Sequence, residues 1–284
     1  MTKMVKVYTY PLANFDLKKP VFVLGGFEAF HLGHLKLLKI AAEINDEIVF
    51  MVIKDPSKLP KNTKENFSDL NARIQMMANS GVKNIILFDF NAELQQLSGE
   101  KFVEIFLKLQ VDFFVVGKNF AFGKNASWNP EQLQEFFPRT KIIEHLKDGQ
   151  KKISTKNLKL FLEFGDFENL NKFLATNFLI SLKIDANKEF VWDKNLICPP
   201  AGFYLAYLVV VNKNLKFPVI LQIKFANKIG KIHFFSKNEH FTGYLEIIKQ
   251  IRYIYSNHTN NLRNDDIEIA KDFFLKNYKK INDF

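Results

Sequence analysis

The stretch VFVLGGFEAFHLGH, residues 21–34, decides the fold of the first half of the chain. Four consecutive apolar residues predict a buried strand, two glycines follow it, and the apolar positions Leu35, Leu38 and Ala41 predict a helix after the turn. A strand, a glycine turn and a helix in this order are typical of an open α/β sheet. In such sheets ligands bind beyond the carboxyl ends of the strands, where glycines and a helix N-terminus can receive a phosphate.

The pattern repeats outward from this stretch. Short apolar runs alternate with segments of helical period, which predicts parallel βαβ units. We expect strands at 48–53, 84–88 and 113–116, and helices at 69–79, around 101–109, at 130–136 and at 156–164, with Gly81 and Gly165 as stops.

The pattern of apolar and polar residues changes after about residue 180. Runs rich in β-branched and aromatic residues, joined by Asn, Lys and Gly, predict a second and mostly antiparallel domain. We expect strands at 180–184, 203–211, 219–225 and 231–235, followed by helices at 242–255 and 265–278. The predicted fold class is therefore α/β, with a Rossmann-like N-terminal domain over residues 1–180 and a smaller β-barrel-like domain over residues 181–284.

Composition places the chain among globular proteins, with 47% apolar and 25% charged residues in 284. The net charge is +10, but only four of the 40 basic residues are arginines. Base readout and bidentate phosphate contacts favour arginine, so we attribute the excess to the A/T-rich codons of Lys, Asn, Ile and Phe and expect no nucleic-acid partner. The charge can still attract phosphorylated substrates.

A cytoplasmic location is expected. The lone Cys198 excludes an internal disulfide framework and fits a reducing compartment. The first residues lack the apolar core of a secretory signal, and no apolar run approaches the length needed to span a bilayer.

His31 and His34 are the candidate catalytic residues. They lie three apart at the start of the predicted helix, separated by Gly33, and imidazoles there can donate hydrogen bonds to phosphate oxygens in a transition state. The alternative is a pair of ordinary cap or surface histidines. A zinc site is disfavoured because no third Cys, Asp or His lies nearby to complete one.

Two further segments are candidate binding sites. In residues 115–124, Gly117, Asn119 and Phe122 can hold a flat ring against the loop, although the two phenylalanines of this loop could equally fill the core. In residues 151–156, Ser154, Thr155 and Lys156 precede a helix and suit a polyphosphate, whereas the alternative is an N-cap with solvated lysines.

All three segments, in this order, resemble the bacterial bifunctional riboflavin kinase/FAD synthetase family. The stretch GFEAFHLGH is similar to the family's G-x-F-D-G-V-H-x-G-H, from which Glu28, Ala29 and Phe30 depart, and GKNFAFG is similar to its G-x-[DN]-F-x-F-G. ISTKNLK is similar to its I-S-S-T-R-I-R, with Asn157 and Lys159 at the arginine positions, so Lys156 or Lys159 would supply the cation.

The resemblance implies an FMN adenylyltransferase that transfers AMP from ATP to FMN, with Mg²⁺, giving FAD and pyrophosphate. It places His31 and His34 at the α-phosphate and names no protein ligand for the metal. The implied binding residues are Gly26, Phe27, His31, Gly33, His34, Ser154, Thr155 and Lys156 for ATP, and Gly117, Asn119 and Phe122 for the flavin.

The second domain resembles the riboflavin kinase barrel through PPAGFY, residues 199–204, which is similar to the family's P-x-x-G-V-Y. The kinase signature G-F-P-T-A-N is absent, and Lys231 stands where the family has a glutamate two residues before a histidine. A charged lysine cannot accept the proton of a hydroxyl nucleophile. We therefore expect a kinase-like fold with a degenerate kinase site.

Three alternatives stay open from the sequence. The chain could be a bifunctional enzyme that retains the kinase, another H-x-G-H nucleotidyltransferase with a different acceptor, or a non-catalytic module that binds a flavin or RNA.

Overall fold

The computed structural model describes residues 4–12, 14–60, 65–148, 151–225, 228–235 and 242–282. These residues divide into two compact units. The first unit holds the described residues of Lys3–Asn66 and Ile74–Thr155. The second unit holds Phe67–Arg73 and the described residues of Lys156–Phe284. The last boundary between the two units lies between Thr155 and Lys156, whereas the predicted domain boundary lies between residues 180 and 181.

The first unit is built on a six-stranded sheet in which every neighbouring pair is parallel. Its strands are, in spatial order, β1 (Lys6–Thr9), β4 (Asn84–Phe88), β3 (Ile48–Ile53), β2 (Val21–Leu24), β5 (Phe113–Gly117) and β6 (Thr140–Ile143). The predicted strands β2 to β5 are confirmed. The edge strands β1 and β6 were not predicted, because only part of each is buried and neither forms a continuous apolar run.

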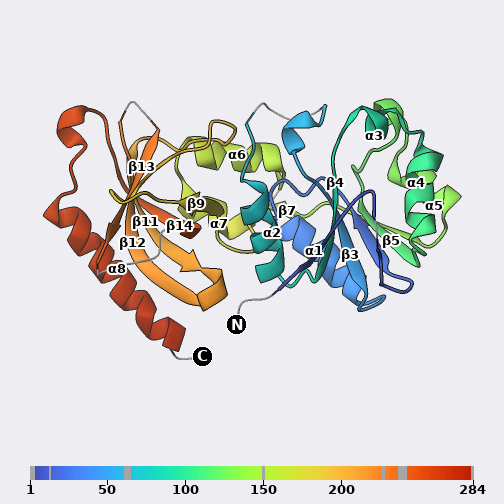
Figure 1. Cartoon of the computed structure of the whole chain (residues 1–284), viewed down its shortest axis with the longest axis horizontal. Helices are drawn as coiled ribbons and strands as arrows, with labels where there is room; N and C mark the ends of the chain where they lie inside the picture. Colours follow the sequence, from blue (N-terminus) through green and yellow to red (C-terminus); the bar gives the residue numbers. More distant parts are fainter. Residues whose placement is uncertain are drawn as a thin grey trace. The chain divides into compact units, whose positions relative to one another are not determined.

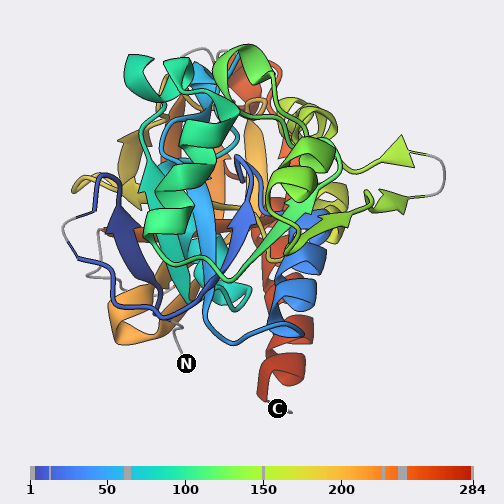
Figure 2. The ribbon, with the colours of Figure 1, turned by 90° about the vertical axis from the view of Figure 1, so that its right-hand side faces the viewer.

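Helices cover both faces of this sheet (Figure 2). The helices of this half of the chain are α1 (Leu32–Ala42), α2 (Leu70–Asn79), α3 (Ala92–Gln96), α4 (Gly99–Lys108) and α5 (Pro130–Phe136). Phe22 and Leu24 share a core cluster with Phe102 and Phe106 of α4, because alternate residues of a strand point to the same face. Helix α1 contacts β2, β3 and β5. A short hairpin, β7 (Lys147–Asp148) with β8 (Lys151–Lys152), extends away from the sheet (Figure 2).

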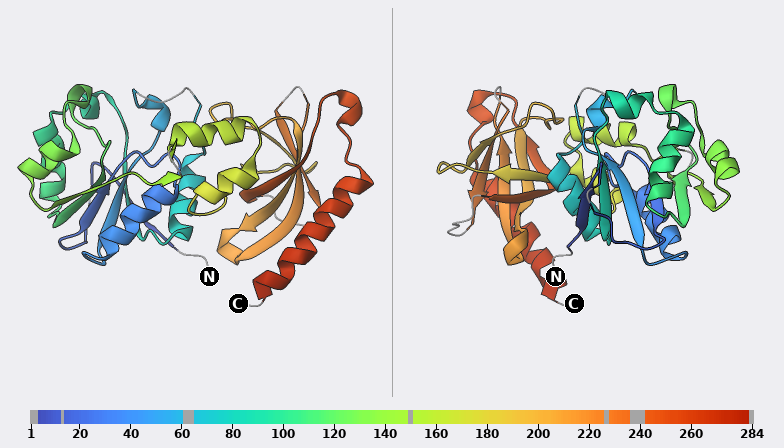
Figure 3. Two further views of the ribbon diagram at one scale, coloured as in Figure 1. Left: turned by 180° about the vertical axis from the view of Figure 1, so that it is seen from behind. Right: turned by 45° about the vertical axis from the view of Figure 1, so that its right-hand side comes forward.

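The second unit curls a six-stranded antiparallel sheet into a barrel-like form (Figures 1 and 3). Its strands are, in order, β10 (Glu189–Val191), β13 (Ile229–Phe234), β12 (Leu215–Ile223), β11 (Gly202–Val210), β14 (Thr242–Tyr253) and β9 (Leu179–Lys183). Helices α6 (Thr155–Glu163) and α7 (Phe167–Phe173) precede it, and α8 (Asn264–Asn282) lies along the sheet (Figure 3). The predicted fold class is confirmed.

The predicted helix at 242–255 is wrong, because this segment forms β14. Leu245 and Ile247, two residues apart, are fully buried, which is the period of a strand rather than of a helix. Tyr244 lies opposite Val209 of β11 on one side and Ser181 of β9 on the other. Hydrogen bonding to two neighbouring strands thus overrides the ambiguous apolar pattern.

A buried ion pair joins the start of helix α8 to β14, in addition to the apolar contacts of Ala270 and Phe274 with the sheet. Arg252 of β14 donates from Nε and Nη2 to the two carboxylate oxygens of Asp266, at 2.8 and 2.9 Å, and the Asp266 side chain is 3% exposed. The same guanidinium donates to the carbonyls of Thr259 and Asn261 and lies over the ring of Phe203. The charged groups of the pair are therefore satisfied within the second unit.

We expect Asp266→Asn to lower the free energy of unfolding of the second unit by about 3 kcal/mol, because it leaves the partly buried Arg252 charge without its counter-ion. Denaturant unfolding followed by circular dichroism measures the loss. The control is Glu168→Gln, which breaks the exposed ion pair with Lys249 and should change stability by less than about 0.5 kcal/mol. Equal effects of the two substitutions would contradict the assignment.

Candidate functional site

The order of strands brings two of the predicted segments to one edge of the parallel sheet. The chain leaves β2 towards β3 and β4 on one side and later returns to β5 on the other. Leu24, the last residue of β2, lies opposite Val116 of β5. The turn after β2 and the loop after β5 therefore start side by side, at the switch point where open α/β sheets bind ligands.

The turn after β2 is closely packed around Phe27. This residue has a left-handed φ of 47°, and its buried ring meets Phe50 of β3 at 4.9 Å between centroids. A Cβ at Gly25 would lie 2.8 Å from the Phe27 ring, and one at Gly26 would lie 3.3 Å from Leu59. A side chain at Gly25 would clash with the Phe27 ring, and one at Gly26 would be tight against Leu59. The predicted approach of this backbone to a phosphate stays a prediction.

His31 is the N-cap of α1. Its Nδ1 accepts a hydrogen bond from the Gly33 N–H at 3.1 Å, so the proton of the neutral ring is on Nε2. A Cβ at Gly33 would lie 2.9 Å from Cε1 of this ring, which explains the glycine between the two histidines. The capping role that stood as the alternative is therefore present, and it places the proton of the neutral ring on Nε2.

His34 has the opposite arrangement of its ring nitrogens. Its Nδ1 donates to the carbonyl of Ala29 at 2.8 Å, so Nε2 of the neutral ring carries a lone pair. The ring stacks on His31 with centroids 3.7 Å apart and meets the edge of Phe27 at 4.8 Å. The pKa of His34 is held well below its usual range, mainly because the ring is buried and secondly because His31 is close to it. The pair thus presents one donor and one neutral acceptor.

The loop after β5 places its three predicted residues in different surroundings. Nothing lies within 4 Å of a Cβ built at Gly117, and Asn119 is exposed. Phe122 is 7% exposed and belongs to the core cluster of the first unit, where it packs against Phe102 and Trp128. Space beside Gly117 and the amide of Asn119 are therefore the parts of this loop that are open to a ligand.

The third predicted segment spans the change of unit. Ser154 and Thr155 are half-buried residues of the first unit. Lys156 is exposed and belongs to the second unit, as does Lys159, which is 4% exposed. The backbone of Lys151 and Lys152 forms β8, and their side chains lie outside the described part of the structure. Within the first unit, the turn that holds His31 and His34 and the loop that begins at Gly117 start side by side at the carboxyl ends of β2 and β5.

The loop after β3 also reaches this edge, although no sequence motif marks it. Its Leu59 lies against Gly26, and Lys58 pairs with Asp89, which follows β4, at 3.0 Å. Asp55 accepts hydrogen bonds from Ser57 and Asn66; although burial acts to raise the pKa of Asp55, these bonds lower it. From the sequence, only its position directly after a predicted strand could have identified this loop as part of the site.

Among the residues that the structure describes, no group of three His, Cys, Asp or Glu side chains could hold a metal ion. Within the same residues, no helix is long and apolar enough to cross a membrane.

Comparison with known proteins gives a match to the FAD synthetase family model over residues 14–157. A bifunctional riboflavin kinase/FMN adenylyltransferase of Buchnera aphidicola is 27% identical over 237 residues, which cover 76% of this chain and 75% of the relative. An FAD synthetase of Listeria monocytogenes is 25% identical over 211 residues, which cover 70% of this chain and 85% of the relative.

A solved structure shares the fold. It is the crystal structure of a protein of Streptococcus pneumoniae described as a macrolide-efflux protein, and it superposes with a TM-score of 0.74 over 97% of this chain and 98% of that one. The two sequences are 17% identical, so the likeness concerns the fold alone.

Protonation of His34 should destabilise the first unit. The native state holds this ring neutral, whereas the unfolded chain binds a proton near the usual pKa of 6.5. The unfolded state then binds more protons below that pH, so stability falls as the pH decreases. We expect His34→Asn, which keeps a donor for the Ala29 carbonyl, to lose less free energy of unfolding than the parent chain between about pH 7.5 and about pH 5.

Urea unfolding across this pH range is the measurement, and the exposed His258→Asn is the matched control. The control should keep the pH dependence of the parent chain. The same dependence in His34→Asn as in the parent would show that His34 is not held neutral.

Proposed function

Because this chain belongs to the FAD synthetase family, we propose that residues 1–180 carry the transfer of the adenylyl group from ATP to FMN, giving FAD and pyrophosphate. The family match over residues 14–157 carries this conclusion. It includes the turn after β2 and the loop after β5, which leave adjacent strands at one edge of the sheet. The protein is a nucleotidyltransferase, with ATP and FMN as its substrates.

The reaction calls for positioning and charge stabilisation more than for a strong base. A phosphate oxygen of FMN, already ionised near neutral pH, bonds to the α-phosphorus of ATP while the bond from that phosphorus to the bridging oxygen breaks. Pyrophosphate leaves with the bonding electrons, and negative charge grows on the oxygens around the α-phosphorus. Donors aimed at these oxygens are the groups that lower the barrier.

His31 is the first of these donors. Its Nδ1 is occupied by the Gly33 N–H, so the neutral ring offers the Nε2 proton to an α-phosphate oxygen with no change of protonation state. The cap hydrogen bond also fixes the orientation of the ring before ATP binds. The N-terminus of α1 adds partial positive charge at the same place.

His34 acts in a different way. Its Nδ1–H is held by the Ala29 carbonyl, so Nε2 becomes a donor only when the ring takes up a proton. The negative charge of bound phosphates favours the protonated ring of His34, and it thus counteracts the lowering of the His34 pKa by burial. We assign His34 to an α-phosphate oxygen as the charge-bearing partner of the neutral His31.

The other roles follow the resemblance. Gly26 and Phe27 allow the backbone to approach ATP, and Gly33 leaves room for His31. Ser154, Thr155 and Lys156 are assigned to the β- and γ-phosphates, and Gly117 and Asn119 to direct contact with the flavin. Phe122, which is buried in the core cluster, is assigned to the flavin site through its support of the loop. Mg²⁺ enters with ATP, held mainly by phosphate oxygens and water, and supplies charge neutralisation. A cytoplasmic location and the lack of a nucleic-acid partner stay predictions from the sequence.

We propose further that the second unit has a kinase-like fold with a degenerate kinase site. Lys231, at the position of the expected glutamate, lies 3.6 Å from Glu189 and is one of two lysines at that carboxylate. The neighbouring His233 is held neutral, because burial and then Lys231 lower the pKa of His233 to about 4. Neither charged Lys231 nor Glu189, occupied by two ammonium groups, is suited to remove a proton from a hydroxyl.

The purified chain with ATP, FMN and Mg²⁺ should form FAD and pyrophosphate, and His31→Ala should lower the turnover by about 100-fold or more. His34→Asn, which retains the bond to Ala29 but lacks Nε2, should lower it similarly. Chromatography of the flavin products gives the rates, and Lys249→Gln on the second unit is the control with unchanged turnover. Normal rates in both histidine variants would overturn the assignment.

Riboflavin with ATP and Mg²⁺ should give no FMN, because the G-F-P-T-A-N motif is missing and Lys231 replaces the base. The same chromatography, with riboflavin in place of FMN, detects the product. Steady formation of FMN, proportional to enzyme concentration and lost in Lys231→Ala, would show instead that the chain is bifunctional.

A further inference from the structure

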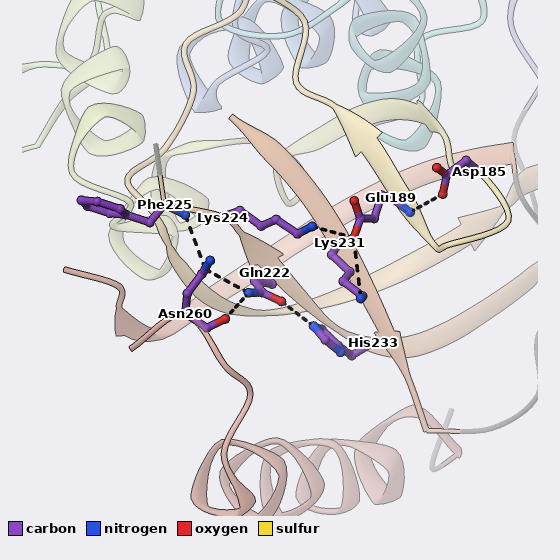
Figure 4. Close-up of polar contacts among 8 residues, drawn as sticks. All are labelled: Asp185, Glu189, Gln222, Lys224, Phe225, Lys231, His233 and Asn260. Carbon is purple, nitrogen blue, oxygen red and sulfur yellow. Dashed lines mark hydrogen bonds and ion pairs between the residues drawn. The ribbon is translucent and has the colours of Figure 1, made fainter. Parts of the chain in front are cut away.

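Two lysines of the second unit share a single carboxylate. Lys224, directly after β12, places Nζ 2.6 Å from Oε1 of Glu189, and Lys231 of β13 places Nζ 3.6 Å from the same oxygen (Figure 4). The three side chains are partly withdrawn from water, with exposures of 24% for Lys224, 37% for Lys231 and 23% for Glu189. The trio therefore has one positive charge more than its carboxylate can balance.

The register of the sheet puts these groups on one face. Glu189 of β10 lies opposite Lys231 of β13, which lies opposite Gln222 of β12. Lys224 follows Gln222 by two residues, and its ammonium group reaches the same carboxylate. Glu189 and Lys231 thus come from two paired strands, and Lys224 comes from the residue that directly follows the third strand, β12.

The polar groups beside the trio are already paired. Gln222 donates from Nε2 to the carbonyl and Oδ1 of Asn260, and its Oε1 accepts the Nε2–H of His233 at 2.8 Å (Figure 4). Asp185 accepts the backbone N–H of Glu189 at 2.8 Å. Among the described residues, Glu189 is the carboxylate that pairs with both lysines. These contacts leave the extra charge at the two ammonium groups.

The neighbouring titratable groups are consistent with a positive local potential. The hydrogen bond from Lys224 lowers the pKa of Glu189, so this group is a carboxylate at neutral pH. Burial, and then Lys231, lower the pKa of His233 to about 4, with Glu189 opposing and Lys224 adding to the effect. His233 is therefore a neutral reporter beside a cationic pair, and its resonance will respond to an added anion.

We propose that Lys224 and Lys231 form a binding site for a phosphate dianion, either a phosphomonoester or free phosphate, which takes the place of the Glu189 carboxylate between the two ammonium groups. A dianion balances both lysine charges, which the single carboxylate does not. Its three or four oxygens can accept hydrogen bonds from both ammonium groups at once. Glu189 is then released to solvent from the edge strand β10.

The residues of this site take no part in the proposed adenylyl transfer. Lys224, Lys231 and Glu189 belong to the second unit, and none of them is among the residues assigned to ATP or FMN. Its test therefore does not depend on FAD formation, and either proposal can fail while the other holds.

The experiment follows the imidazole resonances of His233 by ¹H–¹³C NMR of the full chain, assigned by their loss in His233→Gln. Inorganic phosphate, added at constant pH and ionic strength, should shift these resonances with a saturable curve. Lys224→Gln and Lys231→Gln should each weaken the binding by about tenfold or more. The matched control, Lys249→Gln, removes the same charge from the exposed pair with Glu168 on the same unit and should leave the binding unchanged.

Two further titrations identify the source of the dianion. If FMN shifts His233 and competes with phosphate while riboflavin does neither, the site takes the phosphomonoester of the flavin. If phosphate binds and FMN does not, the site takes free phosphate. The proposal is overturned if millimolar phosphate gives no saturable shift, or if Lys249→Gln weakens binding as much as the two site variants while all three retain adenylyl transfer and the native circular dichroism spectrum.

Discussion

The parallel pairing of β2 with β5 is the constraint on which the candidate site depends. All four residues of β2 are at most 1% exposed, so the strand is held from both faces, with Phe22 and Leu24 packed in the cluster that includes α4. A shift of one residue would turn these side chains to the opposite face. The register of Leu24 with Val116 is therefore fixed by the core, and with it the neighbouring origins of the histidine turn and the Gly117 loop.

The residues of the histidine turn have structural and chemical duties at the same time. His31 caps α1 through Nδ1, and that bond determines which nitrogen carries the proton. His34 is fixed by the Ala29 carbonyl, and that bond leaves its Nε2 without one. The interpretation of these histidines as caps and their interpretation as phosphate ligands are thus compatible. The cap orients the ring, and the orientation gives two neighbouring imidazoles different protonation chemistry.

Strands β2, β3, β4 and β5 were predictable because they are continuous apolar runs. A strand that is buried on both faces needs apolar residues at nearly every position. Strand β14 was missed because its apolar residues also fit a helical period, and its partners β11 and β9 are distant in sequence. The same distance hid the pairs Lys58–Asp89 and Lys224–Glu189, which are 31 and 35 residues apart. Local patterns indicate elements, whereas these pairs exist only after the sheets form.

The excess of lysine is informative only through the partners of each lysine. In the exposed pair of Lys249 with Glu168, one ammonium group is balanced by one carboxylate. Such pairs in water contribute little to stability, and they leave no net charge to bind an ion. Lys224 and Lys231 differ because a shared carboxylate leaves one charge unbalanced and because partial burial weakens screening by solvent. A net charge of +10 spread over the chain does not identify a ligand. Two ammonium groups that share one carboxylate beside a neutral histidine are the local observation from which a dianion site is proposed.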